Sequence, residues 1–378
     1  MDHPRGRLVA GLTTDGGMSD LAAPVAAVRN AVRAALRSAD LAPEALVMVA
    51  CSGGADSLAL AAATAFVAPR LGLRAGLVTV DHGLQAGSAG RAEDVVAWAK
   101  DAHLSPAFSV EVDATPHGDG PEAAARSARY AALADAARRE RAPVVLLGHT
   151  REDQAETVLL ALARGAGVRG LSGMPVRRDA DGVAFLRPLL DVARADTADA
   201  CAELGLVPWT DPHNDDGRFA RSRVRSALPL LSELLGPGVV ANLARTARLV
   251  AADTAALDGW AAAAEATARD DDGSLDIATI ATMPAAIRTR VLRTFALRLG
   301  APAGALAATH IDALDALVMA WHGQGSVALP GAILVGRQAG RLRIAYGNDA
   351  PTFSDENAAS SSPVPEMATG LSAERDGE

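Results

Sequence analysis

The fold is decided by residues 47–60, which read VMVACSGGADSLAL. The apolar run 45–51 predicts a buried strand, and the Ala-rich stretch 58–67 predicts a helix after a Ser-Gly-Gly turn. Backbone N–H groups at such a turn, followed by a helix N-terminus, form a binding site for anions. Two glycines allow close backbone approach, and Ser52 and Ser57 add hydroxyl donors. The stretch therefore predicts a phosphate site. The alternative is a turn in which Ser and Gly serve only the local geometry.

Asp56 is the unusual member of this turn, because a carboxylate repels a phosphate. A divalent cation between the two groups would remove the conflict. The spacing is not that of the G-x-x-x-x-G-K-[ST] loop, and the turn contains no lysine. The turn therefore predicts a phosphate ligand held together with a metal ion.

The composition is that of a globular protein, with 378 residues, 49% hydrophobic and 21% charged, enough for two or three domains. No run of about eighteen uncharged apolar residues occurs, so we expect no membrane span. The N-terminus lacks a signal-peptide pattern, and Cys51 and Cys201 form no C-x-x-C pair. We expect a cytoplasmic protein without a disulfide framework.

The net charge of −9 by itself argues against nucleic-acid binding. Residues 344–378 carry −6 of it, however, which leaves −3 for the rest of the chain. Lys100 is the only lysine, so nearly all positive charge is arginine. Because heavy Ala and Arg usage also follows from genome composition, the arginine excess alone does not indicate RNA binding.

Predicted strands and helices alternate through the first half of the chain. Strands are expected at 45–51, 74–80, 107–112 and 143–148, and helices at 21–37, 58–67, 89–103, 121–141 and 154–164. This alternation predicts an α/β fold with a doubly wound, mostly parallel sheet and with ligands at the carboxyl ends of its strands. A further short strand at 185–190 is expected to lead into a helix at 193–204, and the Gly-rich stretch 164–174 is expected to be a mobile loop.

A second, mostly helical domain is predicted after the Gly-rich turn at 236–238. Helices are expected at 239–269, 284–299 and 310–321, and a small hairpin at 323–346. The predicted organisation is a loose segment at 1–20, a catalytic domain at 21–235, the helical domain at 236–346 and an acidic, disordered tail at 347–378.

Three chemically distinctive segments fall at predicted strand ends: the Ser-Gly-Gly turn, Asp81-His82-Gly83 and Gly148-His149. For His82 an ordinary turn and a nucleotide contact remain open alternatives. For His149 a core histidine and a substrate contact remain open.

The segment 148–157, GHTREDQAET, combines a helix start with three acids. Thr150 and Asp153 fit a capping box, so Asp153 has a structural interpretation. Asp153 and Glu156 nevertheless share one helix face, and such a pair suits Mg²⁺ or an ammonium group.

Charged side chains at other positions have two interpretations each. Glu122, Arg126 and Arg129 lie on one face of a predicted helix, and their spacing alone favours a solvated face with an ordinary ion pair. Asp211 suits a turn. The four arginines between 218 and 225 suit either a solvated face or phosphate binding.

Taken together and in order, these segments resemble the tRNA(Ile)-lysidine synthase family, within the N-type ATP pyrophosphatase superfamily. The resemblance is strong over 45–235 and weak over 239–344. It is carried by CSGGADS (51–57), DHGL (81–84), EAAARSARY (122–130), Gly148-His149, DQAET (153–157), RG (164–165), GLSGM (170–174) and RPLL (187–190). For residues 122–130 it overturns the interpretation based on spacing alone.

The resemblance implies a two-step reaction. The C2 oxygen of the wobble cytidine in a CAU-anticodon tRNA(Ile) attacks the α-phosphate of ATP, and the ε-amine of free lysine then displaces AMP to give lysidine. The implied cofactors are ATP and Mg²⁺, and the implied partners are this tRNA and free L-lysine; a homodimer is compatible with this interpretation.

The resemblance also implies residue roles. The implied catalytic residues are Asp56, Arg126 and Asp153. The implied ATP-binding residues are Ser52, Gly53, Gly54, Ala55, Asp56, Ser57, His82, Gly148 and His149. Lysine is expected to bind Asp153, Glu156 and Asp211, and Mg²⁺ to bind Asp56 and Asp153. The tRNA is expected to contact Glu122, Arg129, Arg164, Arg221, Arg225 and Arg290, with Arg288, Arg293 and Arg298 as further phosphate contacts.

The sequence departs from the family pattern at three places: Thr150 replaces a second histidine, Glu152-Asp153 replaces Asp-Asp, and Ser222 replaces an asparagine. Three other functions would require different sequence features. A related tRNA thiolase would need paired cysteines or a cluster, a nucleotide-binding regulator would need no acid cluster, and a small-molecule synthetase would need no arginine-bearing second domain.

Overall fold

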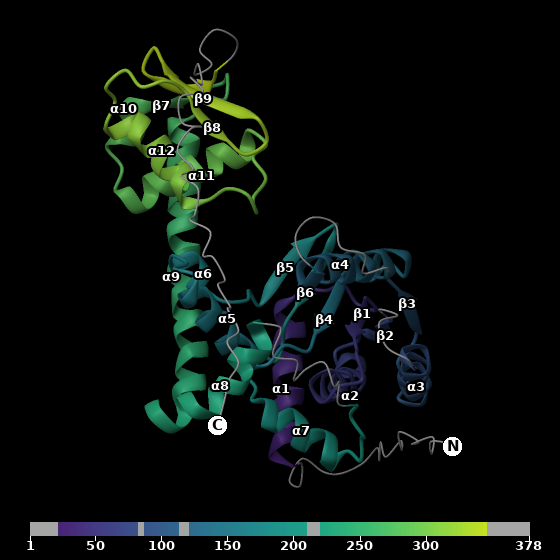
Figure 1. The fold of residues 1–378 in the computed structure, drawn as a ribbon. Coiled ribbons are helices and arrows are strands. Elements are labelled where there is room, and N and C mark those ends of the chain that lie inside the picture. The colour runs from purple at the N-terminus through teal and green to yellow at the C-terminus, as the bar shows by residue number, and fades with distance from the viewer. Residues whose placement is uncertain (1–21, 82–86, 113–120, 210–219, 346–378) are drawn as a thin grey trace, which may run out of the picture. The chain divides into compact units, whose positions relative to one another are not determined.

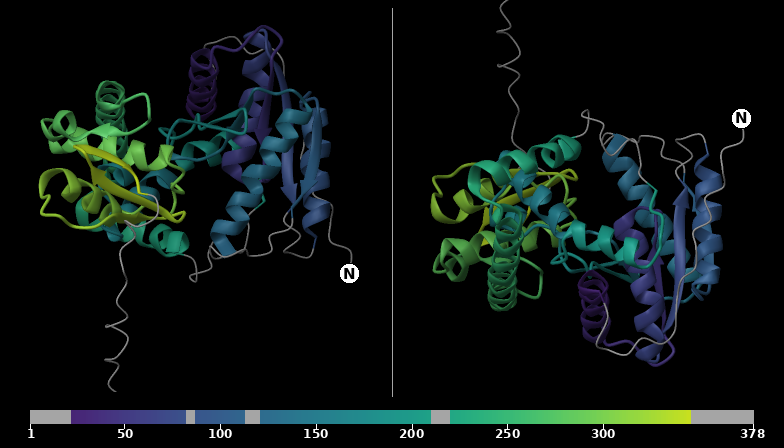
Figure 2. Two further views of the ribbon diagram at one scale, coloured as in Figure 1. Left: turned by 90° about the horizontal axis from the view of Figure 1, so that it is seen from above. Right: turned by 90° about the horizontal axis from the view of Figure 1, so that it is seen from below.

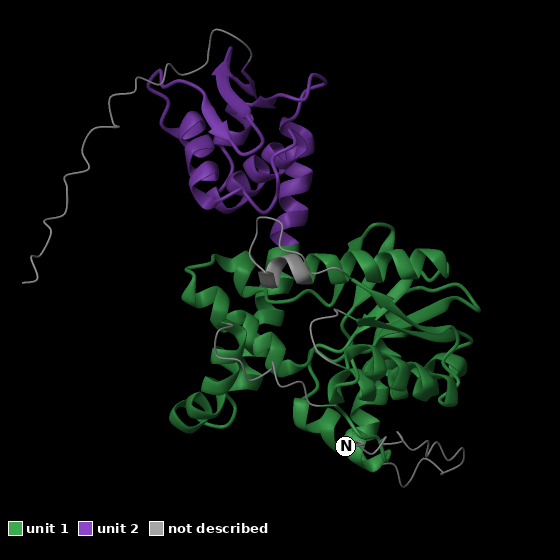
Figure 3. Ribbon diagram, turned by 45° about the vertical axis from the view of Figure 1, so that its right-hand side comes forward, with its two compact units in different colours: residues 1–255 green, residues 256–378 purple. Residues whose placement is uncertain are grey.

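A computed structural model of the chain describes residues 22–81, 87–112, 121–209 and 220–345, without the side chains of 121–125. The chain forms two compact units, residues 1–255 and 256–378 (Figure 3). The division lies inside helix α9 (Val239–Ala268), whereas the sequence placed a boundary at 235/236. The glycine turn there separates α8 (Ala220–Leu235) from α9. The first half of α9 belongs to the first unit, where Ala244 and Ala247 are buried and Thr254 accepts a hydrogen bond from the Ser172 hydroxyl.

The first unit is built on a six-stranded sheet (Figure 1). Every strand pair is parallel except the one between β5 and β6. This arrangement confirms the predicted doubly wound, mostly parallel sheet. In spatial order the strands are β3 (Ala107–Glu111), β2 (Arg74–Asp81), β1 (Leu46–Ala50), β4 (Val144–Leu147), β6 (Val183–Leu186) and β5 (Arg177–Ala180).

Helices cover both faces of the sheet (Figure 2). Side chains of α4 pack on one face, and side chains of the helices α1, α2, α3 and α7 belong to the core on the other. The central strands β1 and β4 are therefore continuous apolar runs: in β1, Val47 and Val49 join one core while Leu46 and Met48 join the other. The helices are α1 (Ala23–Ser38), α2 (Ala55–Arg70), α3 (Ser88–Asp101), α4 (Pro121–Arg139), α5 (Arg151–Ala163), α6 (Val168–Leu171) and α7 (Arg194–Glu203).

Three elements of this unit differ from the sequence expectations. The stretch 164–174, expected to be a loop, contains the single turn of α6. Strand β5 was not expected, because its sequence RRDA carries no apolar alternation and it is held only by its antiparallel pairing with β6. The arginine run at 221–225 lies in α8, whose helical pattern is obscured by four charged or polar residues in its first turns.

The second unit, predicted to be mostly helical, combines helices with a four-stranded sheet of strand order β7-β10-β9-β8. The expected hairpin is the antiparallel pair β9–β10. Strands β7 and β8 have two and three residues, too few for an alternation to show in the sequence. Its elements are β7 (Leu275–Asp276), α10 (Ile277–Ala281), α11 (Ala285–Arg298), α12 (Ala308–Met319), β8 (Val327–Leu329), β9 (Ile333–Gln338) and β10 (Arg341–Ile344).

Among the described helices, none is by itself long and apolar enough to cross a membrane. The pair α8 and α9, bent by 103°, meets the same length and composition criteria only when the two are taken together.

Candidate active site

A cavity of about 520 Å³ opens at the carboxyl ends of β1, β2 and β4. The strand order reverses at β1, which pairs with β2 on one side and β4 on the other. Ligands in open α/β sheets bind at such a reversal. The wall contains the predicted turn and several charged side chains; its residues include Ser52, Gly54, Asp56, Ser57, Arg129, Gly148, His149, Asp153, Arg194, Trp209 and Arg225.

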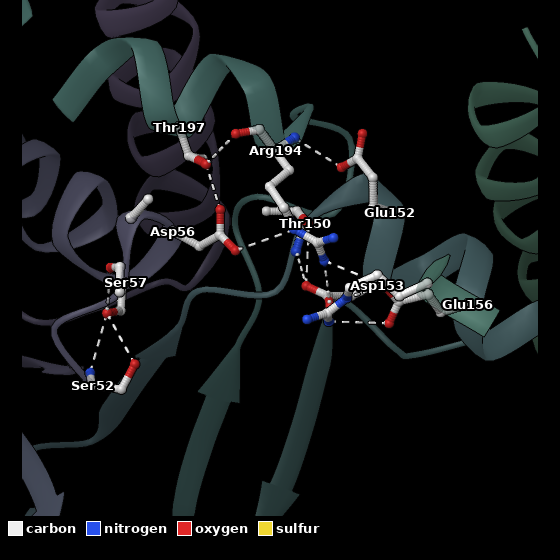
Figure 4. A network of polar contacts seen from close by, with 12 residues as sticks. Ser52, Asp56, Ser57, Thr150, Glu152, Asp153, Glu156, Arg194 and Thr197 are labelled. Atoms are coloured by element: carbon white, nitrogen blue, oxygen red, sulfur yellow. Dashed lines mark hydrogen bonds and ion pairs between the residues drawn. The ribbon is translucent and has the colours of Figure 1, made fainter. Parts of the chain in front are cut away.

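The turn after β1 is organised around the Ser57 hydroxyl. Its oxygen accepts the backbone N–H of Ser52 at 3.1 Å and donates to the carbonyl of Gly54 at 2.9 Å. The Ser52 hydroxyl lies 3.3 Å away (Figure 4). Gly53 has φ +86°, and its carbonyl accepts the N–H of Trp209 at 2.9 Å. The turn therefore directs the start of α2 toward the cavity, as an anion site requires.

We expect Gly53→Ala to lower the free energy of unfolding by about 1–2 kcal/mol, because L-residues are strained at this φ. The added Cβ would also lie 3.2 Å from Cγ2 of Val95. Urea denaturation would measure the loss. Gly54→Ala is the matched control, since its Cβ would meet no atom closer than 3.8 Å and its φ of −74° suits alanine. Equal stability of the two variants would contradict the strain at Gly53.

Gly148 explains how β4 and α2 come together. A Cβ at this position would lie 3.1 Å from the backbone carbon and oxygen of Asp56 and 3.2 Å from Cα of Ser57. Because the neighbouring atoms belong to the backbone, a Cβ would force α2 and the end of β4 apart by a few tenths of an ångström, and glycine avoids this. The close packing brings the segment after β4 against the Ser-Gly-Gly turn.

His149 follows Gly148 and is held neutral. The pKa of its imidazole is lowered to about 3, mainly by burial and also by Arg187 and Arg129, against an opposing effect of Asp153. Its Nδ1 is buried and has no hydrogen-bond partner among the described residues. A neutral ring with an unpaired nitrogen can donate a hydrogen bond to a ligand or accept one from it.

This pKa predicts acid sensitivity. Between pH 6.5 and about 3 the unfolded chain binds a proton at His149 that the folded protein does not, so stability falls as the pH falls. At pH 5 the free energy of unfolding is lower by about 2 kcal/mol for this reason. Between pH 7 and pH 5, we expect the free energy of unfolding of His149→Gln, measured by urea denaturation, to fall by about 2 kcal/mol less than that of wild type. His103→Asn, at an exposed position with positive φ, is the control. A variant curve parallel to wild type would contradict the assignment.

Asp153 and Glu156 on α5 form the centre of an ion-pair network (Figure 4). Oδ2 of Asp153 accepts the N–H and the hydroxyl of Thr150 at 2.8 and 3.1 Å, which confirms the predicted capping box. Its Oδ1 lies 2.9 Å from Arg194 and 3.4 Å from Arg225. Although burial raises the pKa of Asp153, Arg194 and Thr150 lower it more, so the carboxyl stays ionised.

Glu156 is fully buried and lies among guanidinium groups. Arg225 contacts it through Nε at 2.9 Å and through a terminal nitrogen at 3.3 Å. Arg194 lies 3.4 Å and Arg221 3.7 Å from its oxygens. The shared helix face predicted for Asp153 and Glu156 is thus present, and both carboxylates already face cations.

Asp56 stands across the cavity from this pair. Its Oδ1 accepts the Thr197 hydroxyl, and its Oδ2 lies 3.7 Å from Nε of Arg194. Burial raises the pKa of Asp56; Thr197 and Arg194 oppose this, and Asp153 and Glu152 add to it. A carboxylate in this position would be stabilised by an additional nearby cation.

A second cluster gathers four arginines around Tyr130. Arg126, Arg129 and Arg178 lie 5.3, 5.8 and 5.0 Å from the ring centre, and Arg187 donates to the hydroxyl at 2.9 Å. Within the described part of the chain no carboxylate forms an ion pair with any of the four. Arg187 is 2% exposed and its Nε has no partner there. Burial lowers the pKa of Arg126 and Arg129. Cations that have no carboxylate partner among the described residues, one of them fully buried, indicate an anion site.

His82 and Asp211 are outside the described residues, as is the side chain of Glu122. Arg164 is exposed at the end of α5. In the second unit, guanidinium groups predicted to contact phosphate have partners: Arg288 pairs with Asp315, Arg290 with Asp258, Arg298 with Glu265, and Arg293 donates to the carbonyl of Leu306.

Five residues of these clusters were not predicted as site residues: Arg178, Arg187, Arg194, Thr197 and Trp209. Arg194 is the most central of them, because it contacts Asp56, Asp153 and Glu156. No local spacing connects residues that are separated by 38 to 141 positions. Arg187 lies in the RPLL motif, which was its only signal.

Both cysteines of the chain are buried beside the turn. Burial raises the pKa of the Cys51 thiol, and burial with the nearby Asp56 raises that of Cys201 to about 12. Sulfur transfer needs accessible thiolates. These thiols therefore do not suit a thiolase.

Two family models match the chain. A PP-loop domain matches residues 27–231, which contain the cavity, and the TilS substrate binding domain matches residues 275–343. The second match distinguishes this chain from PP-loop proteins in general.

Curated relatives extend the similarity over both units. The tRNA(Ile)-lysidine synthase of Salinispora arenicola is 61% identical over 86% of this chain and 98% of its own length. That of Thermobifida fusca is 56% identical over 86% and 98%. Among solved structures, the U34-tRNA thiolase NcsA from Methanococcus maripaludis with its [4Fe-4S] cluster matches with a TM-score of 0.50 at 18% identity, covering 60% of this chain and 80% of its own. At that identity it shares only the fold.

Proposed function

The chain belongs to the tRNA(Ile)-lysidine synthase family, and from this premise we propose an AMP-forming carbon–nitrogen ligation as its chemistry. The C2 oxygen of the wobble cytidine in the CAU-anticodon tRNA(Ile) attacks the α-phosphorus of ATP, and pyrophosphate leaves. The ε-amine of lysine then attacks C2 of the adenylated base, loses a proton and releases AMP. The thiolase alternative is disfavoured by the second family match and by the buried thiols.

One observation carries the proposal: a single cavity is walled by the phosphate-type turn on one side and by the network around Asp153 and Glu156 on the other. ATP binds with its phosphates on the backbone N–H groups of residues 52–57 and at the N-terminus of α2. The Ser52 hydroxyl donates a hydrogen bond to the phosphates, whereas the Ser57 hydroxyl, expected from the sequence to be a second donor, already donates to the Gly54 carbonyl and holds the turn. Trp209 and Gly148 shape the cavity around the nucleotide. Catalysis then rests on positioning and on charge stabilisation.

Of the two predicted Mg²⁺ ligands, the described surroundings support Asp56. The one described partner of its Oδ2 is Nε of Arg194, at 3.7 Å, whereas both oxygens of Asp153 are already hydrogen-bonded. Mg²⁺ commonly takes one or two carboxylates and completes its shell with phosphate oxygens and water. When bound, the ion would neutralise phosphate charge; Asp56 orients it, and Thr197 fixes the Asp56 carboxylate.

For lysine, we propose Asp153 and Glu156 as the partners of its side-chain ammonium group. Both are buried acids that belong to one helix face. An ammonium group needs such acceptors when it leaves water.

For the tRNA, we propose that the arginines around Tyr130 bind backbone phosphate. Arg126 and Arg129 were predicted from the sequence, and Arg178 and Arg187 complete the cluster. Arginine is suited to phosphate because its planar fork presents several donors.

The proposal is tested with radiolabelled lysine, ATP and purified tRNA. Label in a CAU-anticodon isoleucine tRNA that requires ATP, together with release of AMP and pyrophosphate, supports it. ATP turnover with tRNA but without incorporated lysine overturns it.

A further inference from the structure

The lysine site proposed above is already occupied by the protein's own cations. Oδ1 of Asp153 contacts two guanidinium groups, and its Oδ2 accepts two hydrogen bonds from Thr150. Glu156 has guanidinium nitrogens at 2.9, 3.3, 3.4 and 3.7 Å. Neither carboxylate therefore has an oxygen that faces the cavity without a partner.

Charge balance limits how lysine can enter. At the proposed lysine site itself, the two carboxylates of Asp153 and Glu156 already face the three guanidinium groups of Arg194, Arg221 and Arg225. Lysine that bound without removing one of them would place a fourth cation against two buried carboxylates, at a high electrostatic cost. Exchange of one cation for another keeps the balance.

The contacts identify which arginine is exchangeable. Arg194 is anchored at the start of α7: its backbone N–H bonds Glu152 at 2.8 Å, and its side chain also reaches Asp56. Arg221 lies 3.7 Å from Glu156 and donates to Thr157 at 3.1 Å. All described side-chain contacts of Arg225 are to Asp153 and Glu156, and it lines the cavity.

We infer that Arg225 is the resting occupant of the lysine site, and that the ε-ammonium of lysine binds by displacing its guanidinium from Glu156. This inference rests on the proposed function. It makes Arg225 a competitor of the amino-acid substrate, so the measured affinity for lysine is reduced by the fraction of time that Arg225 occupies the site. It also explains selection for a long cationic side chain, because only a cation can replace Arg225 without unbalancing the network.

The test is the KM for lysine at saturating ATP and tRNA, measured with radiolabelled lysine. We expect Arg225→Ala to lower this KM at least fivefold, and added guanidinium ion to raise it again competitively in the variant but not in wild type. Arg223→Ala is the matched control, because it removes the same charge from an exposed position of the same helix. Its KM should stay within twofold of wild type. Should Arg225→Ala fail to fold, Arg225→Gln retains most of the volume and one amide donor for Glu156, and the same decrease is expected.

Hydrogen exchange on the wild-type protein gives an independent measurement. With a non-hydrolysable ATP analogue present, lysine should change exchange in peptides spanning 220–228, and norleucine, which lacks the ammonium group, should not. The inference is overturned if the KM for lysine is unchanged or higher in both variants, or if hydrogen exchange in residues 220–228 is the same with and without lysine. Failure of wild type to label tRNA at all would instead overturn the proposed function.

Discussion

Asp56→Asn is expected to abolish formation of AMP and pyrophosphate, with a fall in kcat of about 100- to 1000-fold, the range for loss of one preorganised electrostatic group. The carboxylate faces the cavity opposite the Arg194 network, and the proposed function gives it the task of orienting the metal ion. Pyrophosphate release with saturating tRNA and lysine is the measurement.

The fold of this variant should survive. Burial raises the pKa of Asp56, so its charge is a cost to the folded state, and a neutral amide removes that cost. The amide oxygen of asparagine can still accept the Thr197 hydroxyl. Asp199→Asn is the control, since it makes the same change at an exposed position of α7. Turnover like that of wild type would refute the role given to Asp56.

Glu156→Gln should be the most destabilising of the predicted substitutions. It removes the fully buried carboxylate that faces Arg194, Arg221 and Arg225 and leaves a positive charge uncompensated. Breaking a buried pair on one side costs about 3–5 kcal/mol. Because the arginines are 28–31% exposed, we expect about 3 kcal/mol, or a melting temperature lower by roughly 6–12 °C for a unit of this size.

Glu203→Gln is the control for this loss, because Glu203 is exposed at the end of α7. The melting temperature is followed by differential scanning calorimetry for both variants. If Glu156→Gln melts within 1 °C of its control, the network is solvated and contributes little. In that case Arg225 would also have no reason to remain at Glu156, and the lysine-exchange inference would lose its basis.

The sequence by itself determined the parts of this protein that depend on local chemistry. A continuous apolar run marks a strand buried on both faces, and β1 to β4 were each predicted within three residues of their observed ends. The Ser-Gly-Gly turn needs positive φ at Gly53, a property readable from residue type. The capping box of Thr150 and Asp153 likewise follows from a spacing of three.

Other features were decided only in three dimensions. Strand β5 exists because β6 supplies its hydrogen bonds, and its own sequence predicts no strand. Arg194 meets Asp56, Asp153 and Glu156 because α7, α2 and α5 converge at the reversal of strand order. Spacing alone favoured an ordinary helix face for Arg126 and Arg129. Arg178 from β5 and Arg187 after β6 also contact Tyr130 of that helix, which shows Arg126 and Arg129 to be part of a charge cluster.

The physical reason for this division is how far apart in the sequence the interacting residues lie. Turn geometry, capping and strand burial are set by residues within a few positions of each other, so composition and spacing report them directly. Ion pairing depends on distance through space and on burial, and both arise only when remote segments pack. Asp153 and Glu156 were recognised from spacing as acids on a shared helix face, but only the tertiary structure revealed that they already hold three arginines.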